Sequence, residues 1–398
     1  MIQVILTFVL LLVSSLMSLK AATPEVSSAP IVPVVELKGS PYDRGYQHGS
    51  QLKKEISEVY TKWKENVRKD TNKNPDQVIR HFLQTSNYLL AIHKWTPDVY
   101  EELRGLAEGS GQTLDDVLVF QLIDEYWGYL DRLEHNSVSK SHCSAIGVAK
   151  TKDRPTIIAE NIDIDSYMNG YQVLLHIKAS NDTPEQYIMT CAGFLGFAGM
   201  NKDIALVINA LTDLNNSVNG LPVAFVTRGV LAKRSSKEAL EFLKKINHAT
   251  GQNYLIGTSS KVYSFEASAN KVEEFKPFNN NLLVYHTNHS LVNHDVKPWM
   301  KEFHDRVLSG EGKKGNSQTR LASLESQLAK SGQSIDQEVI KNILSSKEDP
   351  IFPICVTYKE GAAGFTFSSV VFTLGKNPYA EVTYGSPDKS QYFKFHFD

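Results

Sequence analysis

Apolar residues recur every three or four positions through residues 51–130, which is the spacing of one face of an α-helix. Leu52, Ile56, Val59 and Trp63 set the pattern. It resumes after Pro75, in a sequence typical of a helix start, and continues through Leu89. Two more helices are predicted over 98–107 and 114–130, on either side of the glycine-containing turn 109–111. We expect a helical N-terminal part whose apolar stripes pack against neighbouring elements.

From residue 144 the pattern changes to short runs rich in Val, Ile, Tyr and Thr, which are typical of strands. Predicted strands lie in 144–150, 156–162, 171–179, 185–193, 204–211, 253–259, 261–268, 281–287, 352–359, 364–374, 380–385 and 391–397. Helical regions are predicted over 236–246 and 317–345, and a surface loop over 309–316. Many strands set between helices predict an α+β fold of two sheets with helical layers outside.

The first residues indicate a secretory signal peptide. Residues 4–17 are strongly apolar and are followed by the small residues Ala21 and Ala22, so residues 1–22 are expected to be removed. The apolar run is shorter than the roughly 20 residues that span a bilayer, and no later segment predicts a membrane span. We expect a protein that is secreted or held in a lysosomal or periplasmic lumen. Asn181 and Asn215 begin glycosylation sequons.

Composition narrows the function. The chain has 398 residues, 41% of them apolar, and a formal net charge of -2. These values exclude a disordered chain and argue against a nucleic-acid partner, which usually requires a basic surplus. Only three cysteines are present, Cys143, Cys191 and Cys355, too few for a disulfide scaffold. The last two lie in apolar runs and are expected to be buried thiols, although a disulfide between them stays open.

Cys143 lies where the helical part gives way to the first predicted strand, after the polar run 134–142. If the bond between His142 and Cys143 were cut, the thiol would gain its own α-amino group as a neighbouring base. Such an amine has a pKa of about 7.7–8.0 and is partly neutral near pH 7. This is the chemistry of an N-terminal nucleophile.

An ordered set of short motifs extends along most of the chain. In order they are SPYDRGYQHGSQL, EELRGLAEGSG, HCSAIGV, NID, CAGFLGFAGMN, VINAL, LPVAFVTRGVLA, VYHTNHSL, NSQTRL, FPICVTY and VTYGSP. In this order they resemble the acyl-coenzyme A:isopenicillin N acyltransferase family of cysteine N-terminal nucleophile hydrolases, and more remotely bile salt hydrolases and acid ceramidases. The resemblance implies a four-layer αββα fold, self-cleavage before the nucleophile, and action on linear amide bonds.

The resemblance also implies site residues. Cys143 matches the nucleophile, and Asp163, in NID, matches the acidic residue that would orient the α-amino group. Asn288 matches an oxyanion-hole asparagine, Asn209 a second amide lining the site, and Arg320 an arginine beside the nucleophile. Cleavage between His142 and Cys143 would leave an α fragment of residues 23–142, mainly helical, and a β fragment of residues 143–398 that carries the αββα catalytic core.

Two positions depart from the related families. His142 stands where the family usually has glycine, and Glu160 where bile salt hydrolases have arginine. The sequence therefore predicts an autoprocessed cysteine amidohydrolase or acyltransferase that cleaves N-acyl amides through a thioester. The alternatives are a ceramidase-like lipid amidase and a non-catalytic secreted binding protein that keeps the fold.

The histidines give weaker support to two other kinds of site, a metal site and a cysteine–histidine pair. His286 and His289 would point to opposite faces of a strand, which disfavours a metal site with His294. A papain-like pair of Cys143 and His289 is conceivable, but the sequence around Cys143 lacks that motif. We predict no cofactor and no metal. The expected partner is a small-molecule or lipid N-acyl amide substrate, and oligomeric state stays open.

Overall fold

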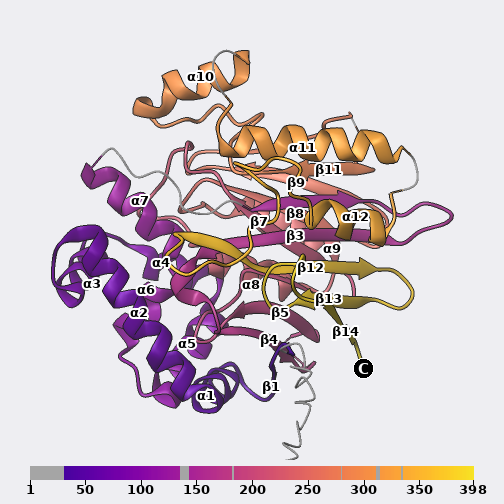
Figure 1. Cartoon of the computed structure of the whole chain (residues 1–398). Coiled ribbons are helices and arrows are strands. Elements are labelled where there is room, and N and C mark those ends of the chain that lie inside the picture. The colour runs from indigo at the N-terminus through magenta and orange to yellow at the C-terminus, as the bar shows by residue number, and fades with distance from the viewer. Residues whose placement is uncertain (1–30, 135–142, 182, 279, 311–313, 333–334) are drawn as a thin grey trace, which may run out of the picture.

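The computed structural model describes residues 31–134, 143–181, 183–278, 280–310, 314–332 and 335–398. The signal peptide prediction, His142 and the predicted cleavage bond lie outside or at the edge of these ranges. Two β-sheets stack in the middle of the molecule, and helices cover their outer faces (Figure 1). No described helix is both long and apolar enough to cross a bilayer.

The larger sheet has eight strands in the order β1-β4-β5-β6-β7-β8-β9-β10. Neighbours are antiparallel except for β1 and β4, which pair in parallel. The N-terminal part therefore supplies an edge strand to a sheet built from the rest of the chain. The strands are β1 (Val34–Leu37), β4 (Gln172–Ile177), β5 (Gln186–Cys191), β6 (Ala198–Met200), β7 (Ala205–Ala210), β8 (Gln252–Gly257), β9 (Val262–Ala267) and β10 (Val272–Glu274).

The second sheet has six strands in the order β11-β2-β3-β12-β13-β14, all antiparallel. Its strands β2 and β3 face β7 and β8 of the larger sheet. Because helices cover the other side, residues on both faces of these central strands are buried. The strands are β11 (Leu283–His286), β2 (Ser144–Val148), β3 (Thr156–Asp165), β12 (Gly364–Leu374), β13 (Tyr379–Thr383) and β14 (Tyr392–His396).

Helices form the two outer layers. Helix α8 (Val223–Leu231) packs on β6 and β7 with α9 (Ser236–Lys245) beside it, while α11 (Asn316–Ser331) and α12 (Gln337–Leu344) cover the six-stranded sheet. A second apolar cluster, which includes Leu324 and Ile340, joins those two helices to that sheet. The arrangement is helix, sheet, sheet, helix, so the predicted αββα fold is confirmed.

The N-terminal helices pack beside the sheets (Figure 1). They are α1 (Pro41–Gln51), α2 (Lys53–Thr71), α3 (Pro75–Gln84), α4 (Tyr88–Trp95), α5 (Pro97–Ser110), α6 (Leu114–Phe120) and α7 (Ile123–Glu134), and α10 (Lys301–Ser309) follows much later. Helices α1 and α5 meet through glycines. A Cβ on Gly45 would lie 1.7 Å from the Glu102 carbonyl oxygen, and one on Gly105 would lie 2.0 Å from that of Tyr42. The motifs RGYQHG and LRGLAEGSG thus encode close helix packing.

The structure corrects several predicted elements. Residues 352–359 form no strand: Pro353 has no N–H for a ladder, and the Cys355 amide donates instead to Ser346 at the end of α12. The predicted helix 114–130 is two helices, and Gly332 at φ 58° ends α11 and so divides 317–345. Leu89, expected in a core stripe, is 39% exposed. The patterns did not predict β1, β6, β10, α1, α8 or α10.

Candidate active site

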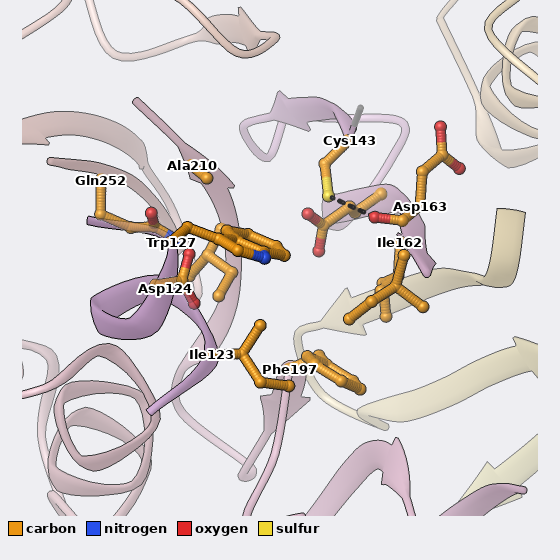
Figure 2. A pocket seen from close by; sticks show the side chains of 12 residues that line it. Ile123, Asp124, Trp127, Cys143, Ile162, Asp163, Phe197, Ala210 and Gln252 are labelled. Carbon is orange, nitrogen blue, oxygen red and sulfur yellow. Dashed lines mark hydrogen bonds between the residues drawn. The ribbon is translucent and has the colours of Figure 1, made fainter. Parts of the chain in front are cut away.

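Cys143 lies immediately before β2, in the central part of the six-stranded sheet, and is 7% exposed. Its thiol donates a weak hydrogen bond to the backbone carbonyl of Asp163, with Sγ 3.8 Å from that oxygen (Figure 2). Strand β3 carries Asp163, and the register of β12 against β3 shifts between Thr366 and Ser368, opposite Asp163. Such bulges are common beside active sites, because they re-aim side chains.

Arg320, on α11, holds the main chain at the nucleophile. It is fully buried, and its Nη1 donates to the Cys143 carbonyl at 2.6 Å and to Ser144 Oγ at 2.8 Å. Nη2 donates to Asn288 Oδ1 at 2.9 Å, and Nε to Asn316 at 2.7 Å. Burial lowers the pKa of this guanidinium to about 10, although Asp163 and Cys143 oppose the fall. The group therefore stays charged at neutral pH. One rigid cation therefore joins three parts of the chain that are far apart in sequence.

The two predicted asparagines differ in how they connect to the nucleophile: Arg320 links Asn288 to it, whereas Asn209 does not line the pocket. Asn288 donates through Nδ2 to the Ala210 carbonyl at 3.2 Å, and its backbone amide donates to Ser317 Oγ. Asn209, fully buried on β7, accepts from Asn253 at 2.8 Å, while its own Nδ2 has no acceptor. Cys143, Asp163, Asn288 and Arg320 are thus connected by direct contacts, and Asn209 adjoins the Ala210 carbonyl that Asn288 binds.

Two carboxyl groups beside Cys143 have no hydrogen bond of normal geometry, namely those of Glu160 and Asp163. Strand alternation sends them to opposite faces of β3. Figure 2 shows the Asp163 carboxylate directed away from the pocket. Burial raises the pKa of Asp163 to about 7, although Thr366 and Arg320 oppose the rise. Burial also raises the pKa of Glu160 well above its usual range.

The thiol itself is held in its neutral form. Burial raises the pKa of Cys143 well above its usual value, and the charges of Glu160 and Asp163 add to the rise, while Arg320 opposes it. A buried thiol needs a nearby base to become a nucleophile. No described histidine serves: His289 binds Ser317 through Nδ1 at 2.6 Å, and burial lowers its pKa to about 4. The papain-like pair is therefore absent from the described contacts.

Cys143 opens onto a cavity of about 30 Å³, enough for one or two water molecules. Its walls are Ile123, Asp124, Trp127, Cys143, Glu160, Ile162, Asp163, Ile164, Phe197, Ile208, Ala210 and Gln252. Figure 2 shows Asp124 and Trp127, from α7, across the pocket from Cys143. Neither residue was predicted from the sequence. The available signal was an adjacent pair of acids, Asp124 and Glu125, in the first turn of α7 beside several apolar and aromatic residues.

Two further cysteines and two buried histidines have structural contacts. Cys191 and Cys355 are free buried thiols, so no disulfide joins them. His48, buried in α1, accepts from the Gly193 amide at 3.0 Å, and burial lowers its pKa to about 4. His286 pairs with buried Glu266, with Nε2 2.8 Å from Oε1.

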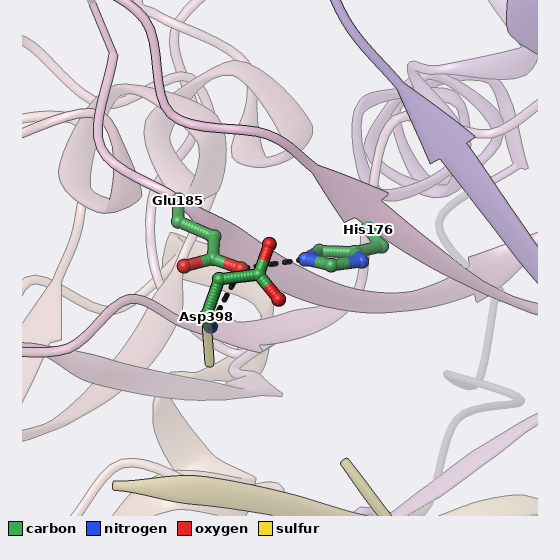
Figure 3. Close-up of side chains that lie close together, drawn as sticks. All are labelled: His176, Glu185 and Asp398. Carbon is green, nitrogen blue, oxygen red and sulfur yellow. Dashed lines mark hydrogen bonds and ion pairs between the residues drawn. The ribbon is translucent and has the colours of Figure 1, made fainter. Parts of the chain in front are cut away.

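Within the described residues, one group has the spacing of a metal site: His176, Glu185 and Asp398 (Figure 3). His176 Nε2 lies 2.7 Å from Glu185 Oε1. Lys178 lies 2.7 Å from Asp398 Oδ2, and Lys202 lies 3.5 Å from Glu185 Oε2. Because a lysine already neutralises each carboxylate, we assign this group to ion pairing.

The raised pKa of Asp163 predicts a pH-dependent stability. Its folded pKa of about 7 lies above the unfolded value of 3.8, so the unfolded chain loses this proton first as pH rises. The free energy of unfolding then falls between about pH 4 and pH 7, by at most about 1.4 kcal/mol per pH unit. In an unprocessed Cys143→Ala chain, Asp163→Asn should flatten this part of the profile, measured by urea unfolding. The exposed control Asp115→Asn should leave the profile unchanged, and parallel profiles for Asp163→Asn and its parent would contradict the assignment.

Comparison with known proteins identifies a family and individual relatives. The family described as acyl-coenzyme A:6-aminopenicillanic acid acyl-transferase matches residues 149–389. The acyl-coenzyme A:6-aminopenicillanic-acid-acyltransferase 40 kDa form of Emericella nidulans is 25% identical over 362 residues, which cover 89% of this chain and 93% of the relative. A Caenorhabditis elegans ortholog of N-acylethanolamine-hydrolyzing acid amidase superposes with a TM-score of 0.40 at 15% identity, over 58% of this chain and 92% of that one.

The family match covers more than half of the chain, and it includes Asp163, Asn209, Asn288 and Arg320 while beginning just after Cys143. It confirms the resemblance that the ordered motifs indicated, and with it an enzyme of the acyltransferase type. The chain belongs to the acyl-coenzyme A:6-aminopenicillanic acid acyl-transferase family.

Proposed function

We propose that this protein is a secreted or lumenal, self-processed cysteine enzyme that cleaves linear amides of N-acyl compounds through a thioester. The observation that carries the proposal is the setting of Cys143. Its thiol borders a pocket, its carbonyl is held by buried Arg320, and an unpartnered carboxyl, that of Asp163, lies close by.

Cleavage of the His142–Cys143 bond would supply the base that the site lacks. The new α-amine would take the thiol proton, and the resulting ammonium would give Asp163 a hydrogen-bonded cationic partner, which its carboxyl lacks among the described residues. Because an ion pair favours the charged carboxylate, its pKa would fall from about 7. Loss of the peptide bond would thus place one ammonium beside two anions, the Cys143 thiolate and the Asp163 carboxylate, with any proton still on Asp163 released to solvent.

In the reaction, the thiolate attacks the amide carbonyl carbon and the carbonyl π electrons move to oxygen. Asn288 and Asn209 are the candidate donors for that oxyanion, and Asn209 Nδ2 is free of any other acceptor. On collapse, the C–N bond breaks and the α-ammonium gives its proton to the leaving amine. Water, or an acceptor amine, then attacks the thioester, gives a proton back to the α-amine and releases the Cys143 sulfur.

The small volume of the pocket favours short acyl groups over the long chains of the lipid amidase alternative. About 30 Å³ of open space beside Cys143 cannot hold a fatty acyl chain without displacement of its walls. A small N-acyl amine is therefore the better substrate class for the first assays.

N-terminal sequencing of the purified protein, combined with a thiol-directed electrophile, tests the proposal. We expect a fragment that begins at Cys143 and carries the label on that residue, together with turnover of a small N-acyl amide. An intact, unlabelled and inactive chain would instead support the non-catalytic binding protein. A fragment with another N-terminus would refute Cys143 as an N-terminal nucleophile.

A further inference from the structure

The pocket beside Cys143 has acidic and amide groups in its lining but no basic residue. Among its described lining residues there is no lysine, arginine or histidine. The nearest guanidinium, that of Arg320, is already committed, because Nε, Nη1 and Nη2 all donate to Asn316, Cys143, Ser144 and Asn288. Among the described lining residues, a substrate carboxylate or phosphate would find no cation.

Asp124 is the acid farthest along the pocket from the reacting sulfur in the view of Figure 2. It is the second residue of α7, is partly buried, and receives no hydrogen bond from a described side chain. Burial raises its pKa to about 7, and the neighbouring carboxyl of Glu125 is buried with it. A cation bound beside Asp124 would relieve this unfavourable burial of negative charge.

Gln252 provides an independent sign of a missing donor. This β8 residue lines the same pocket, is 1% exposed, and its Oε1 has no hydrogen-bond donor. Figure 2 places it on the Asp124 side, across from Cys143. A buried acceptor without a donor typically costs about 1–3 kcal/mol. A bound donor would recover that cost.

The walls between Cys143 and these acceptors are apolar. They comprise Ile123, Trp127, Ile162, Ile164, Phe197 and Ile208. Apolar walls suit a short methylene segment, since burial of each CH₂ contributes about 0.8 kcal/mol. The volume of about 30 Å³ limits that segment to very few carbons. A substrate that fits would therefore place its reacting carbon at the sulfur, a short apolar segment along these walls, and a hydrogen-bond donor at Asp124 and Gln252.

We propose that the acyl group cleaved by this enzyme is short and carries an amine at its far end, which binds Asp124 as an ammonium ion while Gln252 Oε1 accepts one of its hydrogens. The inference rests on the proposed function, because Cys143 must be the nucleophile. The acyl group, rather than the leaving amine, occupies the pocket because it alone stays bonded to the sulfur after the first step.

Three amides of one fluorogenic amine test this preference: 3-aminopropanoyl, butanoyl and succinyl. They have the same chain length and end in ammonium, methyl and carboxylate. At pH 7.5 we expect kcat/KM to fall in that order, at least tenfold at each step. Asp124→Asn should reduce the ratio of the first two by tenfold or more, chiefly through KM. Asp124→Glu should keep part of the preference, and exposed Asp115→Asn should keep all of it.

Equal turnover of the three amides would overturn this inference and leave the proposed function standing. Turnover that depends on a charge in the leaving amine would also overturn it. If no amide is turned over, the proposed function fails, and binding then decides the pocket's preference. In the Cys143→Ala chain, 3-aminopropanamide should raise Tm more than butanamide does, and the reverse order would refute the role of Asp124.

Discussion

Replacing Cys143 by alanine is expected to give one unprocessed chain with no measurable amide turnover. The side chain supplies both the group proposed to attack the His142–Cys143 bond and the group that forms the thioester. No second described nucleophile is placed to replace it, since Cys191 and Cys355 are buried and do not line the pocket. Removal of a catalytic nucleophile typically lowers kcat by about 10⁴–10⁶. Electrophoresis and a continuous amidase assay measure the two losses separately.

Cys191→Ala is the matched control, because it removes a fully buried thiol from β5 that has no role in the proposed reaction. It should be processed and should retain activity. Cys143→Ser distinguishes attack from packing, since the hydroxyl preserves the shape of the side chain but is a weaker nucleophile. Normal activity in Cys143→Ala would end the proposed mechanism, whatever the state of processing.

Replacing Arg320 by methionine is expected to lower the free energy of unfolding by about 3–5 kcal/mol and to abolish activity. The substitution leaves three buried acceptors without their donor: the Cys143 carbonyl, Ser144 Oγ and Asn288 Oδ1. It also removes the positive charge that opposes the raised pKa of Asp163 and of the thiol. Urea unfolding in the single-chain Cys143→Ala background measures the loss of stability without interference from processing.

Arg104→Met is the control for the same chemical change on an exposed helix face, where Arg104 pairs with Glu101 across one turn. We expect no measurable change in its unfolding midpoint. Arg320→Lys tests the fork geometry, because an ammonium group keeps the charge but cannot span the Cys143 carbonyl and Asn288 together. If Arg320→Met left the midpoint unchanged, the contacts of Arg320 would not contribute to stability.

The sequence determined the αββα layers because hydrophobic periodicity reports how each segment is buried. The change from helical spacing to short β-branched runs near residue 143 marked where most of the sheet strands begin. It also placed Cys143 at the start of a strand. The motif order determined the family and, by resemblance, the group of Cys143, Asp163, Asn288 and Arg320. Residues 352–359 were misassigned because an apolar run with aromatic and β-branched residues has the same pattern whether or not it pairs in a sheet.

Only the tertiary structure could decide how the pocket is built. The periodicity of α7 contained no information that Asp124 and Trp127 lie across from Cys143, because that depends on how α7 packs beside two sheets. The tertiary structure also decided that the carboxyl groups of Glu160 and Asp163 are buried without hydrogen-bond partners. It decided as well that Arg320 binds the main chain at Cys143. The local pattern of apolar residues predicts which side chains are buried. The pKa values and the chemistry of the pocket depend on residues that are distant in the chain and meet only in the folded protein.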